Sequence, residues 1–260
     1  MNKTFSLDKT AIAYKKTGAG PALILVDGAF CSSTFGPMPK LVPLLEKYFT
    51  VFTYDRRARG ESGDTKPYAI NREIEDIDAM IQLAGGSAHV FSVSSGAILA
   101  LHAAASGLKI NKLALFEPPF VGDREGRMPT DAETKLTTMI LEKRRDDAVS
   151  FYLRKVMGVP GIVPLILRFT PNWSMMKANA ASLPYDAAIC GDFEVPKQLV
   201  ASILIPTIVI DSSKSPRMLR NGARTVAEML PNAEHTTVKG GIHDAPPKVL
   251  VPVLERFFIH

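Results

Sequence analysis

The stretch that decides the fold is His89-Val90-Phe91-Ser92-Val93-Ser94-Ser95-Gly96-Ala97-Ile98-Leu99-Ala100-Leu101-His102. Its first residues, β-branched and aromatic, predict a strand that stops at Ser92, and the Ala/Leu-rich run from Gly96 predicts a helix. The chain must therefore turn sharply, with Ser94 at the apex. A serine at the apex of a strand-to-helix turn is typical of a nucleophile in a G-x-S-x-G pattern, although Ser92 replaces the first glycine. An ordinary strand-to-helix connection is the alternative.

The sequence on either side of this stretch alternates between strand and helix patterns. Pro21–Val26 is a continuous apolar run, as expected for a strand buried on both faces of a parallel sheet. A helix is expected from Asn71, a candidate N-cap, to the Gly85-Gly86 pair. This alternation predicts a mostly parallel, doubly wound α/β sheet. Further strands are expected at Phe5–Leu7 and Ala11–Tyr14 (an antiparallel edge pair), Thr50–Tyr54, Lys112–Phe116, Pro206–Ile210 and His235–Val238.

The pattern changes after Glu117-Pro118-Pro119. Residues 120–195 contain several helical segments and no convincing buried strand. We interpret them as a helical cap inserted between two strands of a core made of residues 1–119 and 196–260. An insertion over the strand ends would form the roof of a pocket, and its apolar, Met-rich segments predict a pocket for uncharged groups.

Composition and charge exclude several classes of protein. The 260 residues are 46% hydrophobic and 22% charged, which is typical of a globular protein and not of a disordered one. The net charge is +5, but the two densest basic groups, at 56–59 and 143–145, are each followed by acids, and we expect them to be solvated. The sequence contains no basic stripe with stacking aromatics, so it does not predict a nucleic-acid partner. No apolar run is long enough to cross a membrane, and no leader segment is visible, so we expect a cytoplasmic protein.

Four motifs in order along the chain resemble the α/β-hydrolase family. The turn at Ser94 resembles the nucleophile elbow, and the loop at Gly241-Ile242-His243 resembles the one that carries the family's histidine. Asp27-Gly28 falls where the family usually has His-Gly, and Tyr54–Ser62 resembles its D-x-R-G-x-G-x-S loop. The resemblance covers nearly all of the chain and is greatest to small capped members such as enol-lactone hydrolases, esterases and cofactor-free haloperoxidases. It implies the α/β-hydrolase fold with the cap placed as above.

The resemblance also implies a set of site residues. Ser94 would be the nucleophile and His243 its base, because a serine hydroxyl needs an imidazole to accept its proton. The backbone N–H groups of Ala29 and Ser95 would form the oxyanion hole by analogy. Gly28 would lie next to the hole.

Two departures from the family pattern affect the charge of the site. Asp27 replaces a histidine beside the proposed oxyanion hole, where an ionised carboxylate would oppose a developing negative charge. Asp27 must therefore point away, bonded to backbone N–H groups, or be protonated. The family's usual acid falls on Ser215, which leaves Asp211 and Glu117 as candidates for the carboxylate that orients His243. We favour Glu117, which ends a strand at a position resembling the one that supplies the acid in some haloalkane dehalogenases.

The hypothesis that follows is a cofactor-independent serine hydrolase, with no metal, that cleaves a small, largely apolar carboxylic ester or lactone. Two alternatives stay open on the same scaffold. One is a non-hydrolytic enzyme such as a lyase or perhydrolase, and the other is a ligand-binding protein, because a fold does not fix a function. The expected partner is a small-molecule substrate, and the sequence leaves a homodimer possible.

Overall fold

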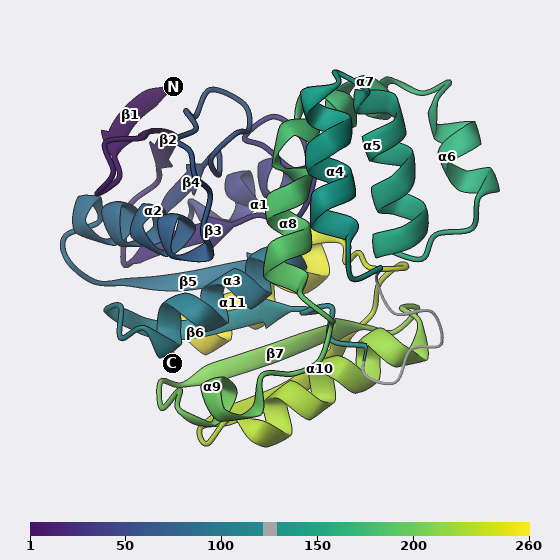
Figure 1. Ribbon diagram of the computed structural model, residues 1–260. Coiled ribbons are helices and arrows are strands. Elements are labelled where there is room, and N and C mark those ends of the chain that lie inside the picture. The colour runs from purple at the N-terminus through teal and green to yellow at the C-terminus, as the bar shows by residue number, and fades with distance from the viewer. Residues whose placement is uncertain (122–128) are drawn as a thin grey trace.

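The computed structural model describes residues 1–121 and 129–260, which form one eight-stranded sheet with helices on both faces (Figure 1). The strand order is β1-β2-β4-β3-β5-β6-β7-β8; β1 and β2 pair antiparallel at one edge, and from β4 onward all pairs are parallel. The strands are β1 (Asn2–Phe5), β2 (Ala11–Thr17), β3 (Ala22–Val26), β4 (Thr50–Tyr54), β5 (Ala88–Val93), β6 (Ile110–Phe116), β7 (Thr207–Ser212) and β8 (Ala233–Val238). The expected mostly parallel, doubly wound sheet is confirmed.

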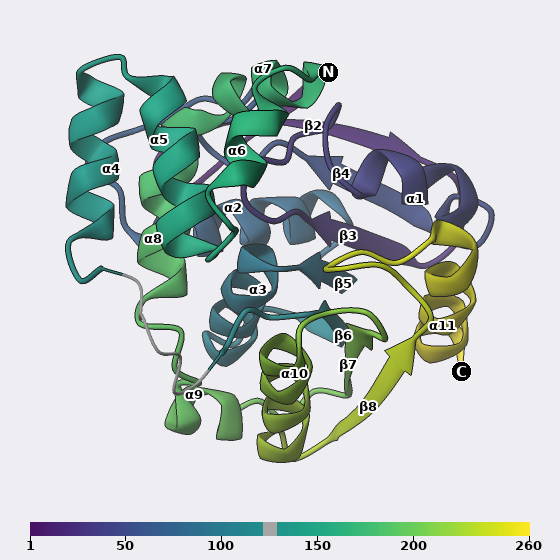
Figure 2. The same cartoon turned by 90° about the vertical axis from the view of Figure 1, so that its right-hand side faces the viewer.

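The two faces of the sheet carry separate hydrophobic cores. The helices α1 (Met38–Leu45) and α11 (Pro247–Ile259) pack on one face against alternate residues of the central strands, such as Leu23 and Leu25. The helices α2 (Ile70–Leu83), α3 (Ser95–Ala105) and α10 (Arg217–Met229) cover the other face (Figure 2). Both faces of the central strands are therefore buried, which explains why β3 and β5 read as nearly continuous apolar runs.

The segment between β6 and β7 is helical, as expected, and stands over one end of the sheet beside α2 and α3 (Figure 1). We call the part from α4 to α8 the cap. Its exact limits at 120 and 195 stay a prediction. The helices of this segment are α4 (Ala132–Leu141), α5 (Arg145–Phe151) with a π-helical end (Tyr152–Val156), α6 (Ile162–Leu167), α7 (Pro171–Ala178), a 3₁₀ turn (Ala180–Ser182), α8 (Leu183–Cys190) and α9 (Lys197–Ala201).

The start of α2 differs from the sequence expectation. The helix begins at Ile70 after Ala69, which has extended dihedral angles, so Asn71 lies inside the first turn and is not the N-cap. Glu73 in that first turn is buried and paired with Arg56, which offsets the missing side-chain cap. None of the helices in the two described ranges is long and apolar enough to cross a membrane.

Candidate active site

Ser94 occupies the turn between β5 and α3 in a strained backbone conformation, with φ 55° and ψ −129°. The N–H of Ser94 donates to the carbonyl of Phe116 on the neighbouring strand at 3.0 Å, which fixes the turn to β6. A Cβ at Gly96 would collide with the carbonyl oxygens of Val26 and Asp27, and one at Gly28 would lie 2.9 Å from the Cβ of Ser94. The turn therefore needs glycine at both positions, because only glycine lets the backbones approach so closely.

The first glycine of the usual pattern is replaced by Ser92 without a clash. Ser92 is fully buried inside β5, and its hydroxyl donates to the carbonyl of Ala114 on β6 at 3.4 Å. The extra side chain is accommodated between two strands because its polar atom has an acceptor there.

His243 is held by Glu117. Nδ1 of His243 lies 2.6 Å from Oε2 of Glu117, and the other carboxylate oxygen accepts the N–H of Ser212 at 2.7 Å. Glu117 is fully buried and follows β6 with a φ of 45°, so the strand ends and the side chain can cross toward the loop after β8. A carboxylate bonded to Nδ1 fixes the imidazole tautomer that leaves Nε2 free to act as a base.

Asp211 has different partners. It lies inside β7, where its Oδ2 is 2.8 Å from Nε2 of His235 and its Oδ1 is 3.5 Å from Nε of Arg220. Ser215, where the family pattern has its acid, accepts the backbone N–H of His243 at 2.8 Å. Of the two carboxylates left open by the sequence, the structure brings Glu117 against His243 and keeps Asp211 with another histidine.

The two N–H groups expected in the oxyanion hole both lie beside Ser94. Ser95 begins α3, and Ala29 follows Gly28 in the loop after β3. Within the described part of the chain, neither N–H donates a hydrogen bond to another residue. Both donors are therefore free to bind a negative oxygen.

Asp27 is buried, and its Oδ1 has no hydrogen-bond partner among the residues that the structure describes. Burial raises the pKa of Asp27 to about 7, although the nearby Arg59 opposes the shift. Near neutral pH the protonated and ionised states of Asp27 are therefore both populated, and only the protonated one puts no negative charge beside the hole.

A cavity of about 930 Å³ lies above these residues, and both Ser94 and His243 line it. Among the described residues, most of the lining is apolar and comes from the core loops, the cap and α10, and Lys40 and Asp244 are its lysine and its acidic residue. The cap side of the lining comprises Tyr152, Val156, Met157, Gly158, Val159, Pro160, Val163 and Cys190. No group of three His, Cys, Asp or Glu in the described ranges could hold a metal ion.

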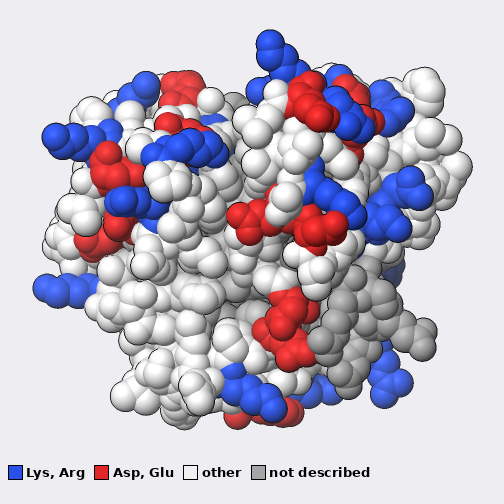
Figure 3. Space-filling view, in the orientation of Figure 1, with Lys and Arg blue, Asp and Glu red and all other residues white. Residues whose placement is uncertain are grey.

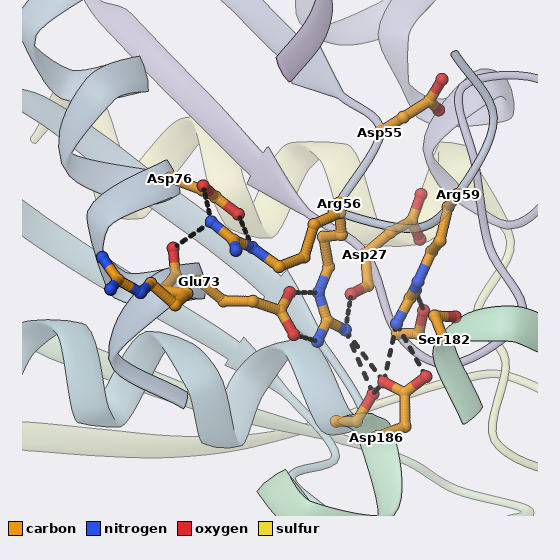
Figure 4. Close-up of polar contacts among 12 residues, drawn as sticks. Asp27, Asp55, Arg56, Arg59, Glu73, Asp76, Ser182 and Asp186 are labelled. Atoms are coloured by element: carbon orange, nitrogen blue, oxygen red, sulfur yellow. Dashed lines mark hydrogen bonds and ion pairs between the residues drawn. The ribbon is translucent and has the colours of Figure 1, made fainter. Parts of the chain in front are cut away.

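The basic group at 56–59 is not solvated as expected: Arg56, Arg57 and Arg59 are almost fully buried. Arg56 lies between Glu73 and Asp186, and Arg59 reaches the same Asp186 from the other side (Figure 4). Buried guanidinium groups need such partners, because an unpaired buried charge is strongly destabilising. The face of the molecule in Figure 3 shows blue and red side chains interspersed, without a basic stripe.

Sequence reasoning missed Asp186 completely. It lies in α8 of the cap, 130 residues from Arg56, and no local pattern marks it. The signal that could have found it is the excess of arginines in a loop that must pack under the cap, since each would need a carboxylate.

A comparison with protein-family models decides the family. The model described as "Alpha/beta hydrolase family" matches residues 20–251. The chain belongs to the alpha/beta hydrolase family. That membership supports hydrolysis as the general reaction class.

Solved structures of other alpha/beta hydrolases have the same fold. One from Sphaerobacter thermophilus is 44% identical, with a TM-score of 0.93, and the match covers 99% of this chain and 100% of that one. The enol-lactonase from Burkholderia xenovorans is 17% identical (TM-score 0.69; 99% and 98% covered), and an esterase from a Rhodococcus species is 16% identical (TM-score 0.71; 98% and 97% covered). At such low identity the last two show the fold alone.

Proposed function

We propose that this alpha/beta hydrolase is a cofactor-independent serine hydrolase that cleaves a small, largely apolar ester or lactone through an acyl-enzyme on Ser94. The observation that carries the proposal is the 2.6 Å contact between His243 and the buried Glu117, in a cavity that Ser94 also lines. A serine that shares a cavity with an imidazole, and a buried carboxylate bonded to that imidazole, are the groups that acyl transfer needs.

In the proposed mechanism, Oγ of Ser94 attacks the carbonyl carbon while its proton passes to Nε2 of His243. The N–H groups of Ala29 and Ser95 bind the oxygen that becomes negative, and each such donor is worth about 100- to 1,000-fold in rate. The tetrahedral intermediate then expels the alcohol oxygen, which takes the proton from His243. A water molecule deprotonated by His243 attacks the acyl carbon, and Ser94 leaves as the hydroxyl.

The cavity supports an uncharged acyl group. Its described lining is mostly apolar, and the charged residues Lys40 and Asp244 in it are exposed, so a charged substrate group would lose its hydration without a buried partner among the described residues. We therefore expect short to medium uncharged acyl chains to be turned over better than dicarboxylate-type esters. Equal or better turnover of the charged esters would contradict this part of the proposal.

The test is labelling with a fluorophosphonate followed by a panel of p-nitrophenyl esters and lactones of increasing acyl length. Wild-type protein should be labelled at Ser94, and Ser94→Ala should lose both label and turnover. Folded wild-type protein that takes no label would favour a ligand-binding protein. A labelled Ser94 with no ester or lactone turnover would favour a lyase or perhydrolase.

A further inference from the structure

The cap and the proposed oxyanion hole are joined through one buried carboxylate, that of Asp186 in α8 (Figure 4). Its Oδ1 accepts hydrogen bonds from Oγ of Ser95 at 2.8 Å, from Nη1 of Arg56 at 3.0 Å and from Nη2 of Arg59 at 2.8 Å. Its Oδ2 accepts a second bond from Nη2 of Arg59 at 2.7 Å. The three donors come from the turn after β4 and from the start of α3, so a single cap residue contacts both segments.

The two arginines continue from Asp186 to the backbone of the loop after β3. Arg56 donates to the carbonyl of Asp27 at 3.1 Å, and Arg59 donates to the carbonyl of Gly28. The carbonyl of Gly28 and the N–H of Ala29 belong to the same peptide unit, which is planar and trans, so they point in opposite directions. Arg59 therefore sets the direction of the Ala29 N–H, and a hydrogen bond from a cation to the carbonyl also polarises that N–H.

The residue that carries the other donor is bonded to the same carboxylate through its side chain. The side chain of Ser95 is bonded to Asp186, and its backbone N–H is the second donor proposed for the oxyanion. The peptide that carries this N–H also contains the Ser94 carbonyl, which accepts hydrogen bonds from the N–H groups of Ala97 at 2.8 Å and Ile98 at 3.4 Å. Helix α3 therefore sets the direction of the Ser95 N–H, and the bond from the Ser95 side chain to Asp186 ties the start of that helix to the cap.

A second cap residue holds the next part of the loop. Nδ2 of the buried Asn179 donates to the carbonyl of Phe30 at 2.8 Å, and Phe30 has an unfavourable φ of 65°. The loop after β3 is therefore held at the carbonyls of residues 27, 28 and 30 by side chains that are themselves in, or bonded to, the cap. Preorganised donors stabilise a transition state only when the surrounding structure keeps them in place.

The geometry points to Asp186 as a positioning residue, which orients the Ala29 donor through Arg59, anchors the residue that carries the second donor, and makes the rate of the chemical step depend on how the cap packs on the core. This inference rests on the proposed function, because it assumes that Ala29 and Ser95 bind an oxyanion. It assigns no contact between Asp186 and the substrate, since Asp186 does not line the cavity.

Asp76 offers a matched control. It pairs with Arg57, the neighbour of Arg56, through two bonds of 2.8 and 2.7 Å, and both side chains are fully buried. Arg57 makes its other contacts to Asp8 and the carbonyl of Arg72, away from the loop after β3. Asp76→Asn and Asp186→Asn thus each remove one buried carboxylate charge, from one arginine partner at Asp76 and from two at Asp186, and only the second variant disturbs the contacts to the loop after β3.

The experiment compares kcat, KM and inhibition by an alkyl boronic acid for the wild type and both variants. Oγ of Ser94 adds to the boron atom, and its proton passes to His243. A boron-bound oxygen then occupies the hole. Asp186→Asn should lower kcat by about 100-fold with KM within about threefold, and weaken boronate inhibition by a similar factor. Asp76→Asn should change neither kcat nor boronate inhibition by more than about threefold, even if it lowers the melting temperature as much as Asp186→Asn does. Equal losses of kcat in the two variants would overturn the inference.

Two further variants keep the test decisive if Asp186→Asn does not fold. Ser95→Ala removes one bond to Asp186 without leaving a charge unpaired, and should lower kcat by about three- to tenfold. Arg59→Lys keeps the charge but lacks the planar fork that reaches both Asp186 and the carbonyl of Gly28, so kcat should fall by tenfold or more. Unchanged kcat in both would overturn the inference. Full turnover in Ser94→Ala would instead overturn the proposed function, so the two failures are distinguishable.

Discussion

Two carboxylate–histidine pairs lie on neighbouring strands of the same sheet, and only one of them faces the cavity. Glu117 follows β6 and binds His243 at 2.6 Å, whereas Asp211 lies within β7 and binds His235 of β8 at 2.8 Å. Both carboxylates are fully buried, so burial does not distinguish them.

The difference lies in the histidine nitrogen that each carboxylate takes. Glu117 binds Nδ1 of His243 and leaves Nε2 unbonded to it, whereas Asp211 binds Nε2 of His235, a residue of β8 that is paired with Val209 of β7. His243 lines the cavity and His235 does not. The same chemical pair therefore serves as a proposed catalytic unit at a strand end and as a cross-strand contact within the sheet.

The largest expected effect is that of Glu117→Gln, which should lower kcat by about 1,000-fold or more. The amide would no longer hold His243 in the tautomer that leaves Nε2 as a base, nor stabilise the imidazolium. Steady-state turnover of a p-nitrophenyl ester measures this, with circular dichroism to check the fold. A greater loss in Asp211→Asn than in Glu117→Gln would transfer the role to Asp211.

The sequence could predict the alternation of strands and helices because each buried strand is a local apolar run. It could also predict that Ser94 and His243 lie at the same edge of the sheet, because both follow the carboxyl ends of parallel strands. It left Glu117 and Asp211 as alternatives because the choice depends on where each strand ends: β6 stops before Glu117, which has φ 45°, whereas β7 continues to Ser212. Strand β6 ends at Phe116 as expected, but β7 runs two residues beyond its expected end at Ile210, and local patterns do not fix a strand end that closely.

The arginines at 56–59 show a second limit of local patterns. The nearby Glu61 suggested a solvated group, but the partners of Arg56 are 17 and 130 residues away, in α2 and in the cap. Glu73, in the first turn of α2, is likewise buried against Arg56 and Tyr68. The burial of these arginines thus depends on partners outside their own loop, which no local pattern marks.

The next effect concerns the buried carboxyl group of Asp27, and it is one of stability. Its pKa is about 7 in the folded protein against 3.8 as an isolated group, so between pH 4 and 7 the folded state binds a proton that the unfolded chain does not. Stability from this group is therefore present below about pH 4 and is lost as the pH rises toward 7.

Asp27→Asn should remove that loss. At pH 8 it should raise the free energy of unfolding by roughly 4 kcal/mol, and near pH 4 it should change little. Urea denaturation at both pH values measures this, and activity should stay within about tenfold. An activity loss of 1,000-fold or more in folded protein would show that Asp27 has a direct catalytic task.

A smaller effect is expected for Asp211→Asn, again on stability. The change weakens the contacts to His235 and Arg220, whose side chains are 19% and 34% exposed, so water replaces part of what is lost. We expect a loss of about 1–2 kcal/mol in the free energy of unfolding, with kcat within about threefold. Glu117→Gln measured in parallel is the control, since it should show the opposite balance between activity and stability.

The smallest effect is expected at Ser215, where the family pattern has its acid. The Ser215 hydroxyl binds the backbone N–H of His243 but not its ring, so Ser215→Ala should lower kcat by only about threefold while Glu117 still orients the imidazole. The position becomes informative in the Glu117→Gln background. In that background, Ser215→Asp would introduce a carboxylate beside the loop that carries His243. If any carboxylate near the imidazole is sufficient, this change should raise kcat about tenfold above that of Glu117→Gln alone. No gain in the double variant, with the fold intact, would show that only a side chain entering from the end of β6 can reach Nδ1 of His243.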